Sequence, residues 1–136
     1  RGIDGMNPKD MAIKAARDAG FTVCYTGPGS ANVIGGTGFA FKCIDGETVL
    51  DLLIPGTEMM KMAFGENPKN AHGKTSKKSP KTRMAVAAML REQLRKARAY
   101  VAAKHAGAIP NYDAKLEALE RVETELEVCL LSYRKR

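Results

Sequence analysis

A glycine-rich segment at residues 27–38 constrains the fold of this chain most strongly, because five of its twelve residues are glycine. Glycine destabilises helices and readily adopts positive φ, so this composition predicts a loop. The run before it, Phe21 to Thr26, is rich in β-branched and aromatic residues and predicts a short buried strand. The segment is therefore either a ligand-contacting loop at the carboxyl end of a strand or a turn-rich connection, and the sequence leaves both interpretations open.

Patterns on both sides of this segment predict an α/β chain. Asn7 and Pro8 are typical of a helix start and Gly20 of a helix stop, which predicts a helix over residues 8–19. The other predicted elements are a β-hairpin of residues 39–44 and 47–54 turning at Asp45-Gly46, a short helix over 57–64 capped by Thr57, and helices from Thr82 to about Gly107 and from Tyr112 through Val122.

Two regions are left less defined by their patterns. Residues 66–81 are polar and contain two prolines and a glycine that break regular structure, namely Pro68, Pro80 and Gly73. We therefore expect a long exposed basic loop. Residues 124–131 either continue the last helix or switch to a strand, because periodicity alone does not distinguish the two.

The net charge of +7 is concentrated in one window of the chain. Residues 69–98 hold ten basic residues and one acid, a charge of +9, so the remaining residues sum to 7 − 9 = −2. Such a block can bind nucleic acid or another anionic surface, and a small basic binding module is our alternative function. No aromatic residue lies within the window to stack on bases, so we regard nucleic acid as an unlikely partner.

The chain is poor in catalytic motifs. Its three cysteines, Cys24, Cys43 and Cys129, lie in apolar segments and are expected to be reduced core thiols. His72 and His105 have ordinary surface explanations, and no metal-binding or nucleophile motif occurs. The longest uncharged apolar stretch is Met84 to Leu90, so we expect no membrane span and a cytoplasmic location. Taken alone, the sequence supports no catalytic mechanism.

Several collinear strings resemble the metal-dependent amidohydrolase superfamily, in its imidazolonepropionase-like branch. They are RGIDGMNP at residues 1–8, TGPGSANVIGG at 26–36, AFGENPK at 63–69 and TRM at 82–84. The resemblance implies an α/β fold that is a partial (β/α)₈ TIM-barrel segment with an inserted β-hairpin and three to four helices. It also implies hydrolysis of C–N bonds other than peptide bonds by a metal-activated water.

The resemblance further implies that residues 1–136 are a single α/β segment from within a larger barrel, because a closed barrel needs about 250 residues. The family's metal ligands fall outside the chain, so we expect no metal or other cofactor in it and zinc or another divalent metal in the parent enzyme. The chain alone is then inactive. A non-catalytic relative is a further alternative, since Leu131-Ser132-Tyr133 stands where the family has a histidine motif.

The implied partners are a small-molecule substrate, in the parent, and a second copy of the chain, because an incomplete barrel exposes strand edges that favour a homo-oligomer. No catalytic or metal-binding residue is assigned. The expected substrate-pocket loop is Gly27, Pro28, Gly29, Ser30, Asn32, Gly35 and Gly36.

Overall fold

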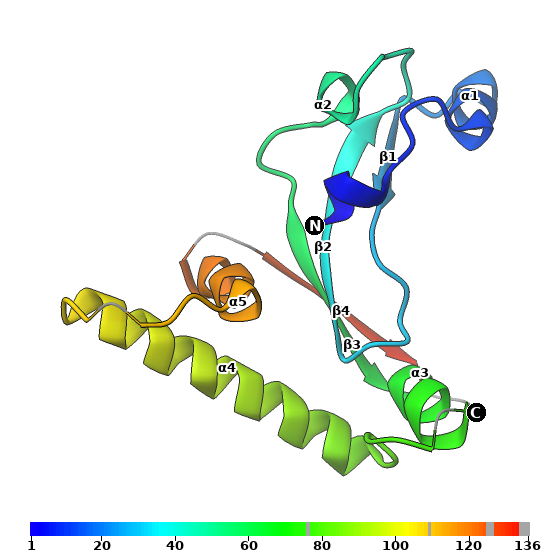
Figure 1. Cartoon of the computed structure of the whole chain (residues 1–136). Helices are drawn as coiled ribbons and strands as arrows, with labels where there is room; N and C mark the ends of the chain where they lie inside the picture. Colours follow the sequence, from blue (N-terminus) through cyan, green and yellow to red (C-terminus); the bar gives the residue numbers. More distant parts are fainter. Residues whose placement is uncertain (76, 109, 125–126, 134–136) are drawn as a thin grey trace. The chain divides into compact units, whose positions relative to one another are not determined.

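The computed structural model describes residues 1–75, 77–108, 110–124 and 127–133. The chain divides into two compact units, which we describe separately (Figure 1). The first unit comprises Arg1–Pro28 and Gly36–Met59, and the second comprises Gly29–Gly35 and Met60–Arg136. The predicted α/β class is confirmed, but the described residues form five α-helices, rather than the expected three to four, and four strands.

The first unit packs helices against one face of a two-stranded antiparallel ribbon. Strand β1 (Val23–Thr26) pairs with β2 (Ile34–Lys42) in a register that sets Val23 opposite Lys42 and Thr26 opposite Phe39. A 3₁₀ turn, η1 (Gly2–Gly5), and helix α1 (Met11–Asp18) precede the strands. The core of this unit consists of Ile13, Phe39, Phe41, Cys43 and Leu52.

Helix α1 and strand β1 confirm two of the predicted elements. The helix begins later than expected because Asp10, rather than Asn7, caps it, and the Asp10 carboxylate accepts a hydrogen bond from the Ala12 amide at 2.9 Å. A side-chain acceptor at this position satisfies one of the amides that the first turn leaves without a partner. The strand occupies the last four residues of the predicted run, but the expectation that it is buried is wrong. Val23 and Tyr25 are exposed because β1 stands at the end of the strand order.

The predicted hairpin turning at Asp45-Gly46 is wrong. Strand β2 pairs with β1, and residues 47–54 contain a one-turn helix, α2 (Val49–Leu52). The physical reason is a capping box, since Asp51 Oδ2 accepts hydrogen bonds from the Thr48 amide at 2.8 Å and the Glu47 amide at 3.1 Å. The chain then returns to the ribbon through a single bridge between Leu53 and Phe41 and a hydrogen bond from the Ile54 amide to the Ala40 carbonyl at 3.0 Å.

The predicted short helix over 57–64 is also wrong, because this segment is strand β3 (Met59–Gly65). Met60 and Met62 alternate into the core of the second unit with Val33, and the Ala63 amide donates to the Val33 carbonyl at 2.9 Å. Methionine favours helices in isolation, but pairing and burial decide the outcome for a short apolar run.

Helical structure also replaces part of the loop predicted for residues 66–81. Helix α3 (Glu66–Lys69) follows β3 directly, and a π-helical turn, η2, spans Asn70–Thr75. Pro68 and Pro80 are fully buried, whereas the lysines at 74, 77, 78 and 81 are exposed, so only the later part has the expected exposed basic character.

The two predicted long helices are confirmed as α4 (Arg83–His105) and α5 (Ala114–Thr124). They pack on each other in the second unit, and their buried side chains Val86, Leu90, Ala97 and Leu119 join the two methionines of β3 in its core. Strand β4 (Glu127–Tyr133) follows α5, so most of the ambiguous range 124–131 is strand, while residues 125 and 126 lie outside the described residues.

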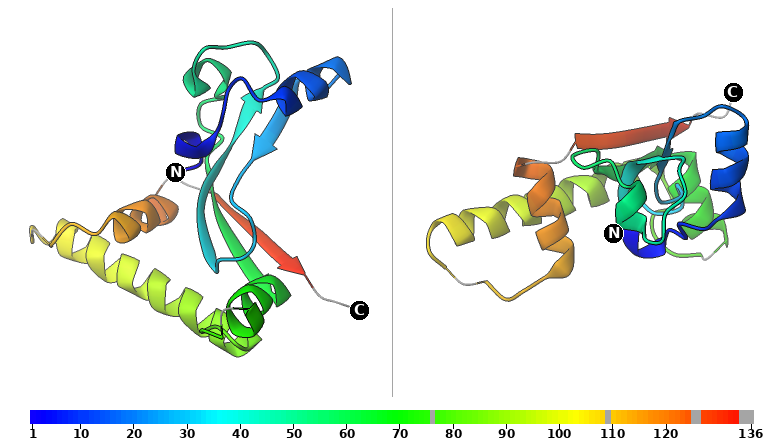
Figure 2. Two further views of the ribbon diagram at one scale, coloured as in Figure 1. Left: turned by 45° about the vertical axis from the view of Figure 1, so that its right-hand side comes forward. Right: turned by 90° about the horizontal axis from the view of Figure 1, so that it is seen from above.

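The strand order is β1-β2-β3-β4. Neighbouring strands β3 and β4 point the same way in Figures 1 and 2, and the chain between them passes through α3, α4 and α5. Parallel strands joined by helices are the repeating connection of α/β folds. No helix in the described part of the chain is long and apolar enough to cross a membrane.

Candidate functional site

The carboxyl end of strand β3, in the second unit, gathers the polar side chains that best qualify as a functional site. Gly65 ends the strand with φ of 102°, a conformation that favours glycine, and the chain turns there into α3. Strand β4 points the same way, so the carboxyl ends of both strands lie at one edge of the sheet. In α/β folds this edge is where ligands bind.

Glu66, the first residue of α3, is held there by two cations. Its side chain is only 13% exposed, and it contacts Lys69 Nζ at 2.7 Å and Arg83 Nη2 at 2.6 Å, with Arg83 Nε at 3.0 Å. The hydrogen bond from Lys69, followed by that from Arg83, lowers the pKa of the Glu66 carboxyl below its usual value. A carboxylate stabilised in its charged form is a poor proton acceptor. The role of Glu66 is therefore structural, because its ion pairs join α3 to the start of α4.

Two residues of the predicted pocket loop reach this edge of the second unit. Lys61 Nζ, on β3, donates a hydrogen bond to Ser30 Oγ at 3.3 Å, and His72 Nε2, in η2, lies 3.0 Å from Asn32 Oδ1. Because an amide oxygen only accepts, His72 donates from Nε2 in this arrangement. Lys61 and His72 thus hold two polar residues of the loop in place, and the group is suited to hydrogen bonding with a polar ligand.

One further acceptor lies at the end of α3. Asn70 Oδ1 is buried and has no hydrogen-bond partner among the residues that the structure describes. A buried acceptor without a partner costs free energy, and such groups are found where a ligand or another chain segment completes the bonding. Sequence reasoning missed Lys61 and Asn70, since neither lies in a motif, and treated His72 as an ordinary surface residue.

The other predicted pocket residues are divided between the two units. Gly29 and Gly35 belong to the second unit, whereas Gly27, Pro28 and Gly36 belong to the first. Gly35 and Gly36 lie in strand β2 rather than in a loop, which corrects that expectation for the end of the segment. Pairing with the neighbouring strands makes these glycines part of β2, and Gly36 has a φ of 111°, a conformation that favours glycine.

Metal ligation finds no support in the described ranges. Within them, no three side chains of the His, Cys, Asp and Glu types lie close enough to hold a metal ion together. The described residues therefore form no metal site, and we derive no reaction step through one.

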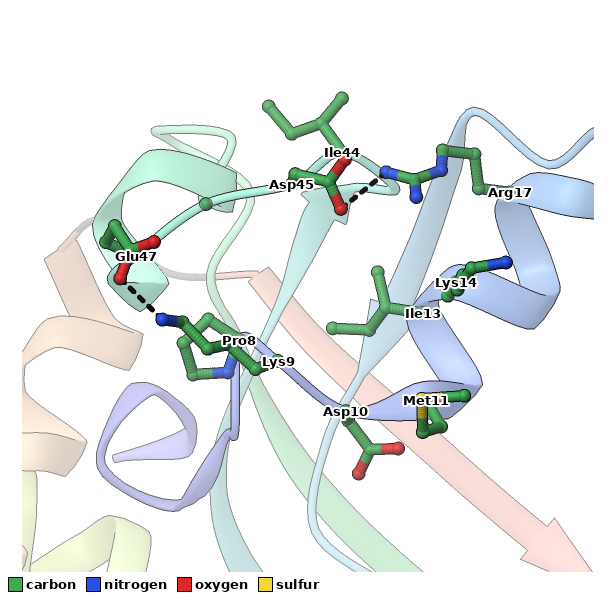
Figure 3. Close-up of a pocket in the computed structure, with 11 residues that line it drawn as sticks. Pro8, Lys9, Asp10, Met11, Ile13, Lys14, Arg17, Ile44, Asp45 and Glu47 are labelled. Atoms are coloured by element: carbon green, nitrogen blue, oxygen red, sulfur yellow. Dashed lines mark hydrogen bonds and ion pairs between the residues drawn. The ribbon is translucent and has the colours of Figure 1, made fainter.

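A separate pocket of about 260 Å³ lies in the first unit, between α1 and residues 44–47 (Figure 3). Two ion pairs border it, Lys9 with Glu47 at 2.5 Å and Arg17 with Asp45 at 2.8 Å. Glu47 and Asp45 are 83% and 92% exposed, so these pairs are solvent-screened surface contacts. The pocket contains none of the predicted site residues.

Comparison with known proteins gives two matches. An amidohydrolase, tasK, from Hapsidospora irregularis is 40% identical over 94 residues, which cover 62% of this chain and 10% of that protein. The crystal structure of an amidohydrolase from Thermotoga maritima MSB8 superposes with a TM-score of 0.86 and 34% identity, covering 94% of this chain and 34% of that one. No protein-family model matches. The chain thus spans about a third and about a tenth of the lengths of these relatives.

Proposed function

We propose that this chain, which belongs to the amidohydrolase superfamily, is an internal segment of a (β/α)₈ barrel enzyme. The parent enzyme, in this proposal, hydrolyses C–N bonds other than peptide bonds. The observation that carries the proposal is the structural match, which extends over 94% of this chain but only 34% of the Thermotoga amidohydrolase. The strands β3 and β4 are parallel and joined through helices, which is the repeating unit of such a barrel and supports the proposal.

In this proposal the chain supplies part of the substrate pocket. Ser30 and Asn32 contact the small-molecule substrate from the loop before β2, and His72 positions the Asn32 amide. Glu66, bound to Lys69 and Arg83, fixes the start of α3 at the carboxyl edge of the sheet. A polar loop held on a rigid edge in this way orients a substrate for reaction.

The residues that activate water belong, in our proposal, to other parts of the parent enzyme. Zinc or another divalent metal would supply a hydroxide nucleophile there. In the same proposal the chain by itself is inactive, because it lacks these residues. The imidazolonepropionase-like branch and the substrate stay predictions.

The test compares the chain with a longer protein extended by its flanking coding sequence. We expect the isolated chain to contain no stoichiometric zinc by elemental analysis and to hydrolyse none of a panel of linear and cyclic amides. The longer protein is expected to contain stoichiometric zinc and to hydrolyse at least one of these amides. A tight equimolar zinc site or amide hydrolysis in the isolated chain would contradict the proposal.

The pocket role of this chain is tested in the longer protein with the variant Asn32→Ala. It is expected to lower kcat/KM about 10-fold or more, because it removes a hydrogen bond to the substrate. The control is Lys115→Ala on the exposed surface of α5, which should leave kcat/KM unchanged. A longer protein that binds amides without hydrolysing them would favour the alternative of a non-catalytic relative.

The other alternative, binding to nucleic acid or another anionic surface, rests on the exposed lysines at 74, 77, 78 and 81. Three basic residues of the same window already have acidic partners, Lys69 and Arg83 on Glu66 and Lys96 on Glu92. We therefore expect no retention of the chain on a heparin column near physiological ionic strength. Strong retention that falls steeply with added salt would favour the basic binding module.

A further inference from the structure

Two cysteines of the first unit lie in contact, although they are nineteen positions apart in the chain. Cys24 lies on β1 and Cys43 directly follows β2, and the Cys43 thiol donates to Cys24 Sγ at a sulfur–sulfur distance of 3.5 Å. The antiparallel register creates this contact, since Cys24 is opposite Phe41 and the Cys43 amide donates to the Thr22 carbonyl at 2.9 Å. Both cysteines are free thiols.

The two thiols differ in their access to solvent. Cys43 is 2% exposed and belongs to the core of the first unit, whereas Cys24 is half-buried at its margin. Burial, followed by the hydrogen bond with Cys24, raises the pKa of the Cys43 thiol above its usual value. A reagent from solution therefore meets Cys24 first, and Cys43 can react only from inside the unit.

We propose that Cys24 and Cys43 form a reversible dithiol–disulfide site that a small disulfide, such as oxidised glutathione, oxidises. Cys24 loses its proton, and its thiolate attacks one sulfur of the oxidised glutathione, breaking that S–S bond and releasing one glutathione thiolate. Cys43 then loses its proton and attacks Cys24 Sγ, which displaces the second glutathione. The two cysteines give up two electrons and two protons in total, and one glutathione disulfide becomes two thiols.

The neighbouring thiol decides between two products. A lone cysteine stops at the mixed disulfide with glutathione, because no second thiol lies within reach to displace it. Here Cys43 already lies against the sulfur that carries the mixed disulfide, so the intramolecular bond follows at a high effective concentration. The bond joins β1 to the segment after β2 and restricts the unfolded chain, which should raise the urea midpoint of the first unit.

The test treats the full chain with oxidised glutathione, labels the remaining thiols with an alkylating reagent after denaturation, and maps the peptides by mass spectrometry. We expect two of the three thiols to be lost, with Cys24 and Cys43 in one cross-linked peptide pair that retains no glutathione. Dithiothreitol should restore both thiols. The control Cys129→Ser should give the same cross-link, because its thiol takes no part in the reaction.

The variant Cys43→Ser should retain glutathione on Cys24, which is the product of the first step alone. Should that variant fold poorly, the peptide map of the wild-type chain still decides the matter. The proposal is overturned if Cys24 and Cys43 of the wild-type chain stay alkylatable after oxidation, if each carries its own glutathione, or if either is cross-linked to Cys129.

Discussion

Gly38 in strand β2 occupies a position where a larger residue has no room. A Cβ atom built there would lie 2.4 Å from Tyr25 Oη and 2.5 Å from the Thr26 carbonyl oxygen, both in the first unit. The variant Gly38→Ala is expected to lower the free energy of unfolding by about 1–3 kcal/mol, because the backbone of β1 must shift to accommodate the methyl group. Urea denaturation followed by circular dichroism measures the change.

The control for this prediction is Gly29→Ala. A Cβ atom at Gly29 meets nothing within 4 Å, so its effect should stay within about 1 kcal/mol and can be stabilising. Equal losses in the two variants would mean that the tight contact between β1 and β2 is not the cause.

At the scale of single elements, helix α4 depends on its N-terminal cap. Thr82 Oγ1 accepts a hydrogen bond from the Ala85 amide at 3.1 Å. Removing it in Thr82→Ala should cost about 1 kcal/mol of the free energy of unfolding, the usual effect of losing a threonine cap. Thr82→Ser keeps the hydroxyl and should remain close to the wild type in the same urea titration; a serine variant as unstable as the alanine variant would argue against the cap.

The packing of α5 on α4 includes a charged cluster with a defined pH response. Lys104 Nζ lies 2.6 Å from Glu117 Oε1 and 2.6 Å from Glu120 Oε2, and Tyr100 Oη donates to Glu117 Oε1. Lys104, followed by Tyr100, lowers the pKa of Glu117 below its usual 4.5, while Glu117 and then Glu120 raise the pKa of Lys104 above its usual 10.5.

These shifts set the pH range over which the cluster stabilises the helix pair. A lowered carboxyl pKa contributes stability above pH 4.5 that is lost as the pH falls through the lowered pKa, and a raised ammonium pKa contributes stability below pH 10.5 that is lost on going higher. The variant Lys104→Met should therefore have a lower urea midpoint than the wild type near neutral pH, and the gap should narrow in strong acid and strong base. A gap independent of pH would contradict this origin.

Sequence patterns identified the elements whose signals are local. Helices α1, α4 and α5 followed from caps and amphipathic spacing, and β1 followed from its apolar run. The errors fall on short segments, where pairing decides: Met59–Gly65 has residues that suit a helix, yet it pairs as β3. The Thr48–Asp51 spacing of a capping box was present in the sequence and could have identified α2.

The candidate site was only partly predictable for a related reason. Ser30 and Asn32 lie in the segment that its glycine content identifies as a candidate loop. Their partners Lys61 and His72 are far away in the sequence. The contact between Cys24 and Cys43 likewise depends on strand register, which no local pattern specifies.

At the scale of the whole molecule, self-association is a prediction that concerns the outer edge of strand β1. In the strand order β1 stands at the end, and among the described residues no strand pairs with its outer edge. Within β1, the apolar residue Val23 is 48% exposed and the aromatic residue Tyr25 is 42% exposed. We propose that this edge pairs with a second copy of the chain, since apolar open edges promote such pairing.

Light scattering tests the proposal against a monomer mass of 14.7 kDa. The wild-type chain should exceed that mass, and Val23→Lys should return toward it, because a charge on an open edge opposes pairing. Ala15→Lys places the same charge on the exposed side of α1 and should leave the mass unchanged. A wild-type chain that scatters as a monomer at all concentrations would rule the edge pairing out.

The parallel neighbours β3 and β4 also carry a consequence for the order of folding. Strand β4 follows β3 only after the whole of α3, α4 and α5, so their pairing closes a long loop and costs entropy before it gains hydrogen bonds. The contacts between α4 and α5 are local and form at much smaller entropic cost. The helical pair is thus expected to assemble first as a template, with β4 adding to the sheet afterwards, so that growth of the sheet follows completion of each helical connection.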